Sequence, residues 1–405
     1  MVTASSLPVP VGGLTRPAAT ESRLLRADLG RLDEVSASLA ATAAEYDRTG
    51  SFPHAPLQLV HEAGLLTAGV DAKYGGSGVS FTDVTKILLA LGRGDPSTAL
   101  IAGMTIVPHL LQTRSPWPEE LYARVLEESA LRPTLLNHAR AEPEMGSSTR
   151  GGLPATTARR TANGWSIRGR KRFVTGAEGL SYFLVWAATD EASPRVGNFV
   201  VPARTPGIEI VPTWHQLGMR ATGSHEVRFT DVEIPAEYVH ELEAPGAAPV
   251  AGRLPGTIML LLSSALYLGV ARAAQQYVHT FAHERVPAAL GRSLATTDRV
   301  RQAAGEIETL LAGAEQLIFG VADRVDRGVP VGGVDALAAK VVVVRHVTTA
   351  VQTGLRLLGN PGLAQANPLE RHFRDIQSVG VHAPQEDAAL AVIGAAALAK
   401  EAPGA

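Results

Sequence analysis

Apolar residues recur every three or four positions between residues 299 and 325, and this spacing constrains the fold more than any other feature of the sequence. They occupy positions 300, 303, 307, 310, 314, 317, 321 and 325. Residues at this spacing share one face of an α-helix. A second segment, residues 335–358, places Leu337, Val341, Val344, Val347 and Val351 on one side. The two segments predict long helices of a bundle.

The sequence pattern changes twice along the chain, from helical to strand-like and back. Residues 23–131 show helical spacing in segments such as 32–46 and 55–63, broken by Pro and Gly, and Asp95-Pro96-Ser97 is typical of a helix start. Residues 137–235 instead contain short β-branched runs between turn residues. Helical patterns return from about residue 255. The sequence therefore predicts an α+β fold with a flexible tail (1–20), an N-terminal helical domain (21–135), a middle β domain (136–245) and a C-terminal helical bundle (246–405).

Composition limits the partners of the protein. The chain has 405 residues, is 45% hydrophobic, carries a formal charge of −2 and has no cysteine. This balance does not favour nucleic acid or a membrane surface as partner, and any redox chemistry requires a cofactor. The first twenty residues do not resemble a signal peptide, and the apolar run 258–271 is shorter than the ~20 residues that cross a bilayer. We expect a cytoplasmic protein with small-molecule substrates, and 258–271 as a fully buried helix.

Several common chemistries have no signature here. The sequence contains no intact Gly-x-Gly-x-x-Gly turn after a strand and no Gly-Lys pair, which disfavours a Rossmann dinucleotide site and a P-loop. We find no Ser, His and acid set that indicates a hydrolase. His279 and His283 lie four residues apart, the spacing of two metal ligands on one helix face. Without a third ligand nearby, surface positions are the better interpretation, and no metal is predicted.

Six segments in the same order resemble the acyl-CoA dehydrogenase superfamily along nearly the whole chain. The segments are residues 64–80, 141–148, 169–176, 217–235, 284–291 and 358–375, and the stretch 217–235, which begins Leu-Gly-Met-Arg-Ala-Thr-Gly-Ser, is the most specific. The resemblance implies an N-terminal helical domain, a middle β-barrel domain and a C-terminal four-helix bundle. It also implies bound FAD or FMN and a homotetramer.

The resemblance places the flavin on particular residues. Ala141 and Ser147 belong to the loop that approaches the flavin and substrate, although the family has Thr where this chain has Ala141. Phe173, Val174 and Thr175 correspond to the strand beside the flavin ring, where an aromatic side chain can stack and a hydroxyl can approach N5. The remaining predicted cofactor ligands are Arg285, which would pair with the pyrophosphate in a neighbouring subunit, Gly359 and Gln385. Around Arg285 the spacing and the neighbouring residues depart from the family, which leaves both FAD and FMN open.

The catalytic carboxylate of the dehydrogenases has no counterpart. The two family positions for this base correspond to Ala383 and about Met259, and neither side chain can accept a proton. Glu386 and Asp387 lie close behind, but they are expected to begin the last helix, where acidic residues favour the helix dipole. The turn around His382 instead resembles that of the flavin monooxygenases in the superfamily. His382 is the predicted catalytic residue, with a helix cap or a carbonyl contact as the alternative role.

Three functions follow. The preferred hypothesis is a monooxygenase that uses O2 and reduced flavin from a partner reductase on a small or carrier-bound metabolite. The second is a dehydrogenase of an acyl thioester with a relocated base such as Glu386. The third is a non-catalytic ligand-binding or scaffold protein that retains the fold.

Overall fold

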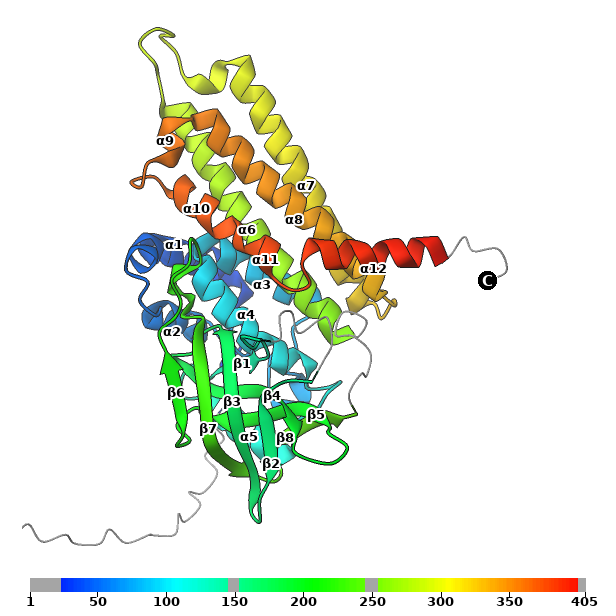
Figure 1. The fold of residues 1–405 in the computed structure, drawn as a ribbon. Helices are drawn as coiled ribbons and strands as arrows, with labels where there is room; N and C mark the ends of the chain where they lie inside the picture. Colours follow the sequence, from blue (N-terminus) through cyan, green and yellow to red (C-terminus); the bar gives the residue numbers. More distant parts are fainter. Residues whose placement is uncertain (1–22, 145–152, 245–253, 400–405) are drawn as a thin grey trace, which may run out of the picture.

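The computed structural model describes residues 23–144, 153–244 and 254–399, without the side chains of 254–259. The sheet lies at one end of the molecule and the long C-terminal helices lie at the other (Figure 1). Between them run α3 (Phe81–Gly94) and α4 (Pro96–Leu111), and α4 contacts both the sheet and the bundle. The predicted α+β architecture is confirmed.

The N-terminal helices follow the sequence pattern closely. They are α1 (Leu32–Thr49), α2 (His54–Glu62), α3, α4 and α5 (Glu119–Ser129), with short 3-10 turns at Leu29–Arg31 and Ala72–Tyr74. The predicted start at Asp95 is confirmed, because its carboxylate accepts hydrogen bonds from the amides of Ser97 and Thr98. These bonds satisfy amides that have no partner inside the helix.

The middle of the chain forms one eight-stranded sheet. Its strands are β1 (Leu135–Ala139), β2 (Thr157–Arg160), β3 (Gly164–Val174), β4 (Leu180–Thr189), β5 (Val196–Pro202), β6 (Ile208–Val211), β7 (His225–Pro235) and β8 (Val239–Glu243). They are ordered β6-β7-β3-β2-β4-β5-β8, and β1 pairs in parallel with β4. Strand β3 pairs with β2 and β7, so it occupies the interior of the sheet.

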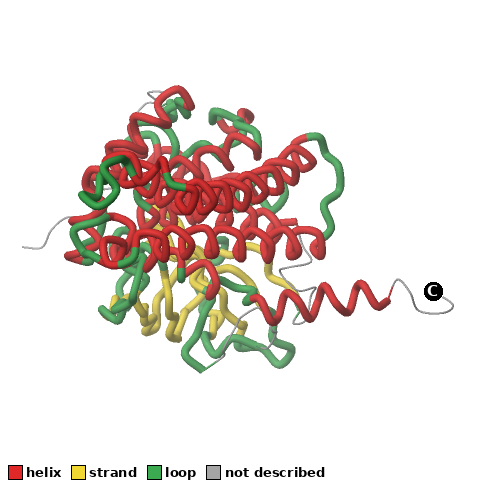
Figure 2. Tube along the Cα trace, turned by 90° about the horizontal axis from the view of Figure 1, so that it is seen from above, coloured by secondary structure: helices red, strands yellow, loops and turns green. Residues whose placement is uncertain are grey.

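The C-terminal half is helical. It contains α6 (Leu254–Glu284), α7 (Asp298–Asp326), α8 (Gly333–Leu358), α9 (Asn360–Leu363), α10 (Pro368–Ile376), α11 (Ser378–Val381) and α12 (Glu386–Ala399). A short 3-10 turn at Leu294–Thr296 lies between α6 and α7, and another at Arg220–Thr222 precedes β7. The helices predicted from the two apolar stripes are α7 and α8. The apolar run that begins at residue 258 forms the first part of α6. Helix α12 projects away from the remaining helices (Figure 2).

A pair of glycines lets α3 and α6 pack backbone to backbone. A Cβ added at Gly92 would lie 2.2 Å from the carbonyl oxygen of Leu266, and one added at Gly269 would lie 2.2 Å from that of Leu89. Larger residues at either position would force the helices apart. This close contact fixes α6 against the N-terminal domain. Among the described residues, no helix is both long and apolar enough to span a membrane.

Candidate flavin and substrate site

A bulge in β3 turns Phe173 out of the sheet. The pairing register of β3 with β7 shifts between Lys171 and Val174, and Phe173 between them has φ of +57°. A non-glycine residue in this region is strained, and bulges re-aim side chains next to functional sites. As a result Phe173 is 56% exposed while Val174 is buried. An exposed aromatic ring held on an interior strand is suited to stack on a planar ligand.

Aromatic and cationic groups flank this ring. The ring of Trp214 lies edge-on with its centroid 6.3 Å from that of Phe173, and the guanidinium of Arg172 lies 5.0 Å from the Phe173 centroid. The backbone amide of Arg172 donates to the carbonyl oxygen of Ala141, at 2.8 Å. This bond brings the loop that carries Ala141 beside the bulge. Ser147, further along that loop, lies outside the described residues.

Thr175 lies at the end of β3 in a buried hydroxyl cluster. Its Oγ1 lies 3.0 Å from Oγ of Ser224, which lies 2.8 Å from Oγ1 of Thr222. Asn137 Nδ2 donates to the backbone oxygen of Thr175, at 2.8 Å. The cluster ties β1, β3 and the 217–224 segment together. Thr175 is only 8% exposed, so its hydroxyl is held rigidly beside the bulge.

A buried ion pair pins the loop after β1. Lys171 Nζ lies 2.7 Å from Oε1 of Glu142, with side chains 0% and 2% exposed. The Glu142 carboxylate also accepts from the amides of Ala155 (2.7 Å) and Thr156 (2.9 Å). Burial raises the pKa of Glu142, but the bonds from Lys171 and Thr156 outweigh it and hold that pKa below its usual value. One carboxylate thus joins the start of the predicted flavin loop to the residues that precede β2.

The 217–224 segment docks onto the helical bundle. The Met219 amide donates to Oδ1 of Asp375 at 2.7 Å, and a Cβ at Gly218 would lie 2.4 Å from the carbonyl oxygen of Arg374. Asp375 is buried, and burial raises its pKa to about 7. Arg374 in turn pairs with Asp47 of α1, at 2.6 Å. The sheet, α1 and α10 therefore meet in one rigid corner.

His382 lies in the turn between α11 and α12 and contacts the bundle through its side chain and its backbone. Its Nε2 is 2.7 Å from the hydroxyl of Tyr267 on α6. Its carbonyl oxygen accepts from Nζ of Lys340 at 2.9 Å, and Lys340 also donates to the carbonyl oxygen of Pro384. Burial, together with the nearby charge of Lys340, lowers the pKa of His382 to about 4. The side chain of His382 is therefore neutral at pH 7.

Gln385 has an unsatisfied polar atom. Its Oε1 is buried and has no hydrogen-bond partner among the described residues, while its backbone oxygen accepts from the amide of Ala389 at the start of α12. A buried acceptor without a donor is rare and costs about 1–3 kcal/mol. A ligand that offers an N–H or O–H would satisfy it. Gln385 Oε1 and the exposed ring of Phe173 are thus both available for contacts with a ligand.

The structure offers no free carboxylate at the positions of the family base. Ala383 carries none, and the side chain of Met259 lies outside the described residues. Glu386 begins α12, as expected, and its Oε1 accepts from Arg345 at 2.6 Å. The Glu386 carboxylate is therefore already engaged by a guanidinium at the start of α12.

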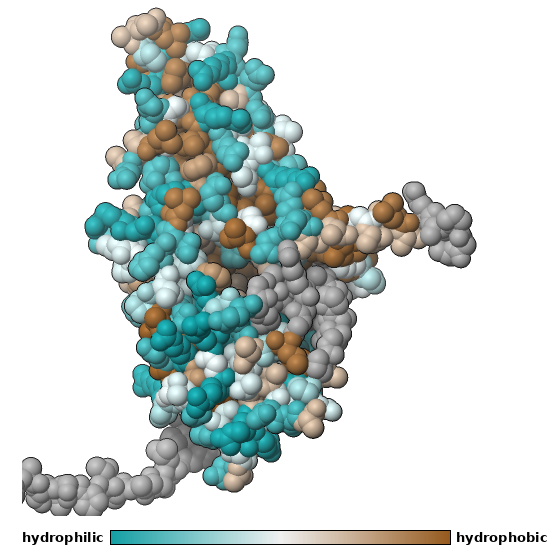
Figure 3. All heavy atoms as spheres, in the orientation of Figure 1, coloured by the Kyte–Doolittle hydropathy of each residue, from teal (hydrophilic) through white to brown (hydrophobic). Residues whose placement is uncertain are grey.

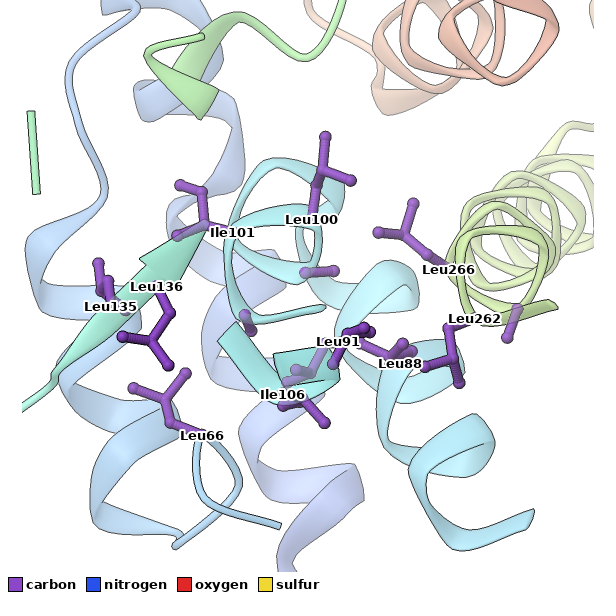
Figure 4. Packing of buried hydrophobic residues seen from close by; sticks show 14 of the residues in the cluster. Leu66, Leu88, Leu91, Leu100, Ile101, Ile106, Leu135, Leu136, Leu262 and Leu266 are labelled. Carbon is purple, nitrogen blue, oxygen red and sulfur yellow. The ribbon is translucent and has the colours of Figure 1, made fainter. Parts of the chain in front are cut away.

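An apolar recess opens between α3, α4 and α6. It is lined by Leu88, Ala99, Leu100, Gly103, Met104, Val107, Leu262, Ser263 and Leu266, and about 10 Å³ of it is accessible to the centre of a water molecule. Figure 4 shows Leu88, Leu100, Leu262 and Leu266 around this space. A Cβ added at Gly176 would lie 3.4 Å from Ile101 of α4, so this helix also reaches the Thr175 turn. The recess is apolar, but as it stands it has room for no more than about one water molecule.

Arg285 and Gly359 follow the ends of α6 and α8 that lie at the far end of the helical bundle from the sheet (Figure 1). Arg285 follows the last residue of α6 and is exposed, and a 31-residue helix spans about 45 Å. Gly359 ends α8 with φ of +64°, and a Cβ there would contact nothing within 4 Å. Neither residue joins the site around Phe173 in one chain. His279 and His283 are exposed, and the described residues contain no cluster suited to a metal.

Sequence reasoning missed the supporting residues, above all Tyr267 and Lys340. Tyr267 carries a hydroxyl inside an apolar run, and Lys340 puts a charge directly beside Val341 in the buried stripe of α8. A polar group in a buried stripe needs a partner, and this signal was available in the sequence. The partner itself depends on how the α11–α12 turn packs, which the pattern does not give.

Three family models match the chain in order. They describe the N-terminal domain (residues 21–114), the middle domain (137–232) and the C-terminal domain (261–386) of acyl-CoA dehydrogenases. YdbM of Bacillus subtilis, named as an acyl-CoA dehydrogenase, is 34% identical over 89% of this chain and 93% of its own. The L-evernosamine nitrososynthase of a Micromonospora strain is 29% identical over 90% and 91%.

A solved structure adds a ligand-bound relative. KijD3 in complex with FMN and dTDP-3-amino-2,3,6-trideoxy-4-keto-3-methyl-D-glucose is 29% identical, with a TM-score of 0.81 over 96% of both chains. Fold and sequence thus define one class of protein, the flavin-dependent oxidoreductases with three-domain acyl-CoA dehydrogenase architecture. The chain belongs to the acyl-CoA dehydrogenase superfamily, as predicted.

Proposed function

We propose that this protein is a monooxygenase that uses reduced FMN or FAD and O2 to oxidise a small or carrier-bound metabolite. The observation that carries the proposal is His382, which lies in the turn where the family resemblance expects the dehydrogenase base, while Ala383 occupies the position of the base itself. The methyl side chain of Ala383 cannot accept the α proton of a thioester. Reduced flavin supplies the two electrons, one oxygen atom enters the substrate, and the other leaves as water.

The residues around the bulge would hold the flavin. Phe173 would cover a face of the ring, Thr175 would approach its N5 side, and Gln385 Oε1 would accept from a ring or ribityl donor. Ala141, which the amide of Arg172 holds beside the bulge, would approach the ring, and Ser147 is proposed as a further flavin contact. Arg285 and Gly359 would serve the flavin of a neighbouring subunit, since α6 carries Arg285 too far from the Phe173 of its own chain.

His382 would then face the reacting centre as a neutral group. Because burial holds its pKa near 4, it would orient substrate or oxygen by hydrogen bonding and would not carry a positive charge at pH 7. The recess between α4 and α6 would take the apolar part of the substrate. Leu100 and Leu266 would have to move apart for a group larger than a water molecule.

The relatives support the oxygenase hypothesis and supply candidate substrates. KijD3 holds FMN together with a dTDP-linked amino sugar, and a second relative is named for an amino-sugar nitrososynthase activity. Nucleotide-linked amino sugars are therefore the first substrates to test. A reductase that delivers reduced flavin is the expected partner, and the cytoplasm is the expected compartment.

Helix α12 suggests self-association, in line with the homotetramer expected from the family. Leu390, Val392 and Leu398 are 42%, 48% and 76% exposed. Figure 3 shows apolar residues along this projecting helix. Exposed apolar side chains on one projecting element are typical of an interface. We propose that α12 packs against another copy of the chain.

The second candidate is an acyl-thioester dehydrogenase, which the identity to YdbM favours. One experiment separates the two. Protein loaded with oxidised flavin is mixed anaerobically with acyl-CoA thioesters of several chain lengths, and flavin absorbance is followed. Bleaching without a reductase would establish the dehydrogenase. The oxygenase predicts no bleaching, and predicts a product heavier by one oxygen atom when reductase, NADH, O2 and an amino-sugar substrate are supplied.

The same assay tests the non-catalytic alternative. A scaffold protein gives no product with any substrate, and His382→Ala then changes nothing except stability. The monooxygenase hypothesis predicts that His382→Ala lowers product formation while the flavin remains bound.

A further inference from the structure

Tyr267 is the only side chain described in hydrogen-bond contact with the His382 ring. Its side chain is fully buried in α6, and its hydroxyl lies 2.7 Å from Nε2, with ring centroids 5.5 Å apart. Burying a phenol requires a polar partner. Among the described groups, Ser378 and Asp375 are the other polar neighbours that act on this hydroxyl.

Lys340 fixes the backbone that carries the ring. It is 3% exposed, and its Nζ donates to the carbonyl oxygens of His382 and Pro384, the two neighbours of Ala383. Burial lowers the pKa of Lys340 to about 8. An ion pair between Arg345 of α8 and Glu386, the first residue of α12, also holds this turn on α8. The turn is thus held by α8, and the ring by α6.

The hydrogen bond between phenol and imidazole has a preferred direction. Burial raises the pKa of Tyr267 well above its usual value, so the hydroxyl keeps its proton. A neutral imidazole has one donor and one acceptor nitrogen, and its acceptor nitrogen is a stronger acceptor than a phenol oxygen. The phenol therefore donates to Nε2. The imidazole proton then resides on Nδ1.

We propose that Tyr267 and Lys340 are positioning residues that hold His382 neutral, with its proton on Nδ1, so that the ring can donate a hydrogen bond through Nδ1 and not through Nε2. The catalytic role assigned to His382 rests on the proposed function, whereas the charge and the tautomer of its ring do not. In this state Nε2 is occupied, so His382 cannot act as a general base through that nitrogen. Its role is to orient an oxygen atom of substrate or O2.

Ring nitrogen chemical shifts test the state directly. Protein labelled with ring-15N histidine and kept free of flavin is titrated with acid, and the His382 signal is assigned by its loss in His382→Gln. We expect the Nδ1–H tautomer and a pKa clearly below 6.5. Tyr267→Phe removes only the hydroxyl, and should give a mixture of tautomers and a higher pKa. Tyr277→Phe, on a half-buried tyrosine of the same helix, should change neither.

Two outcomes would overturn the proposal: an Nε2–H tautomer in the unmodified protein, or an unchanged His382 signal in Tyr267→Phe. If Tyr267→Phe does not fold, Lys340→Met replaces it, because loss of the neighbouring cation must also raise the pKa of His382. Flavin binding is measured separately in each sample. Loss of flavin binding in the unmodified protein would refute the proposed function and leave the tautomer assignment standing.

In the loaded enzyme the same variants provide a kinetic readout. Tyr267→Phe should shift the acid limb of the kcat/KM profile to higher pH by the amount that the NMR pKa moves, with unchanged flavin affinity. A structural role alone would lower activity at every pH without moving the limb. Such a uniform loss would contradict positioning.

Discussion

Replacing Lys171 with Met should destabilise the protein by about 3–5 kcal/mol, the usual cost of removing one partner of a buried ion pair. Met keeps most of the aliphatic volume and removes the ammonium group. Glu142, whose side chain is 2% exposed, would retain the amides of Ala155 and Thr156 but lose its counter-ion. Lys171 Nζ also donates to the carbonyl oxygen of Trp186, which would lose that bond. The expected loss is therefore near the upper end of this range.

Urea unfolding followed by tryptophan fluorescence measures this loss, since Trp165 and Trp186 lie on β3 and β4. Arg168→Met is the matched control. Arg168 lies on β3 with Lys171, but the side chains of its ion pair with Asp231 of β7 are 64% and 55% exposed. Exposed pairs contribute about 0–1 kcal/mol. Adding Glu142→Gln to Lys171→Met should recover part of the loss, since the unpaired charge is gone. If Lys171→Met costs no more than Arg168→Met, the pinned-loop argument is wrong.

Two further predictions concern pH and assembly. His372 is 4% exposed, and burial lowers its pKa to about 3, so the unfolded chain takes up a proton below about pH 6.5 and the folded chain does not. The free energy of unfolding therefore falls as pH falls from about 6.5 toward 3, by about 1.4 kcal/mol per pH unit for this group. Between pH 6 and pH 5, the urea midpoint of His372→Gln should fall less steeply than that of the unmodified protein. Equal slopes would contradict this prediction. Leu390→Glu with Leu398→Glu should lower the molar mass measured by light scattering and leave the fold intact, whereas an unchanged mass would remove α12 from the interface.

Much of the fold was predictable because helices carry a strong periodic signal. The stripe of residues 299–325 predicted α7, and the capping carboxylate of Asp95 predicted where α4 begins. Strands were predicted as a region, whereas their order was not. The order β6-β7-β3-β2-β4-β5-β8 depends on pairings between distant segments, such as β3 with β7, and local sequence does not encode them.

The candidate site was predictable only in its outline. The resemblance indicated Phe173, but the positive φ that exposes it arises from a bulge between two paired strands. His382 was predicted from the resemblance, whereas its hydrogen-bond partner Tyr267 lies 115 positions away on another helix. Glu142 and Lys171 were both inside recognised segments, yet their fully buried pairing depends on the sheet register. The site is completed by contacts between residues far apart in the sequence, which the spacing of residues along the chain does not predict.

The central claim is that a flavin ring stacks on Phe173, and titration of the purified protein with FMN and FAD, oxidised and anaerobically reduced, tests it most directly. We predict binding at micromolar concentration with quenching of flavin fluorescence, and an affinity roughly tenfold lower in Phe173→Ala, as expected for an aromatic contact of about 1.4 kcal/mol. Arg168→Met serves again as the control, because this exposed residue of β3 lies outside the proposed flavin contacts. A colourless protein that retains neither flavin, or equal affinity in Phe173→Ala, would contradict the account.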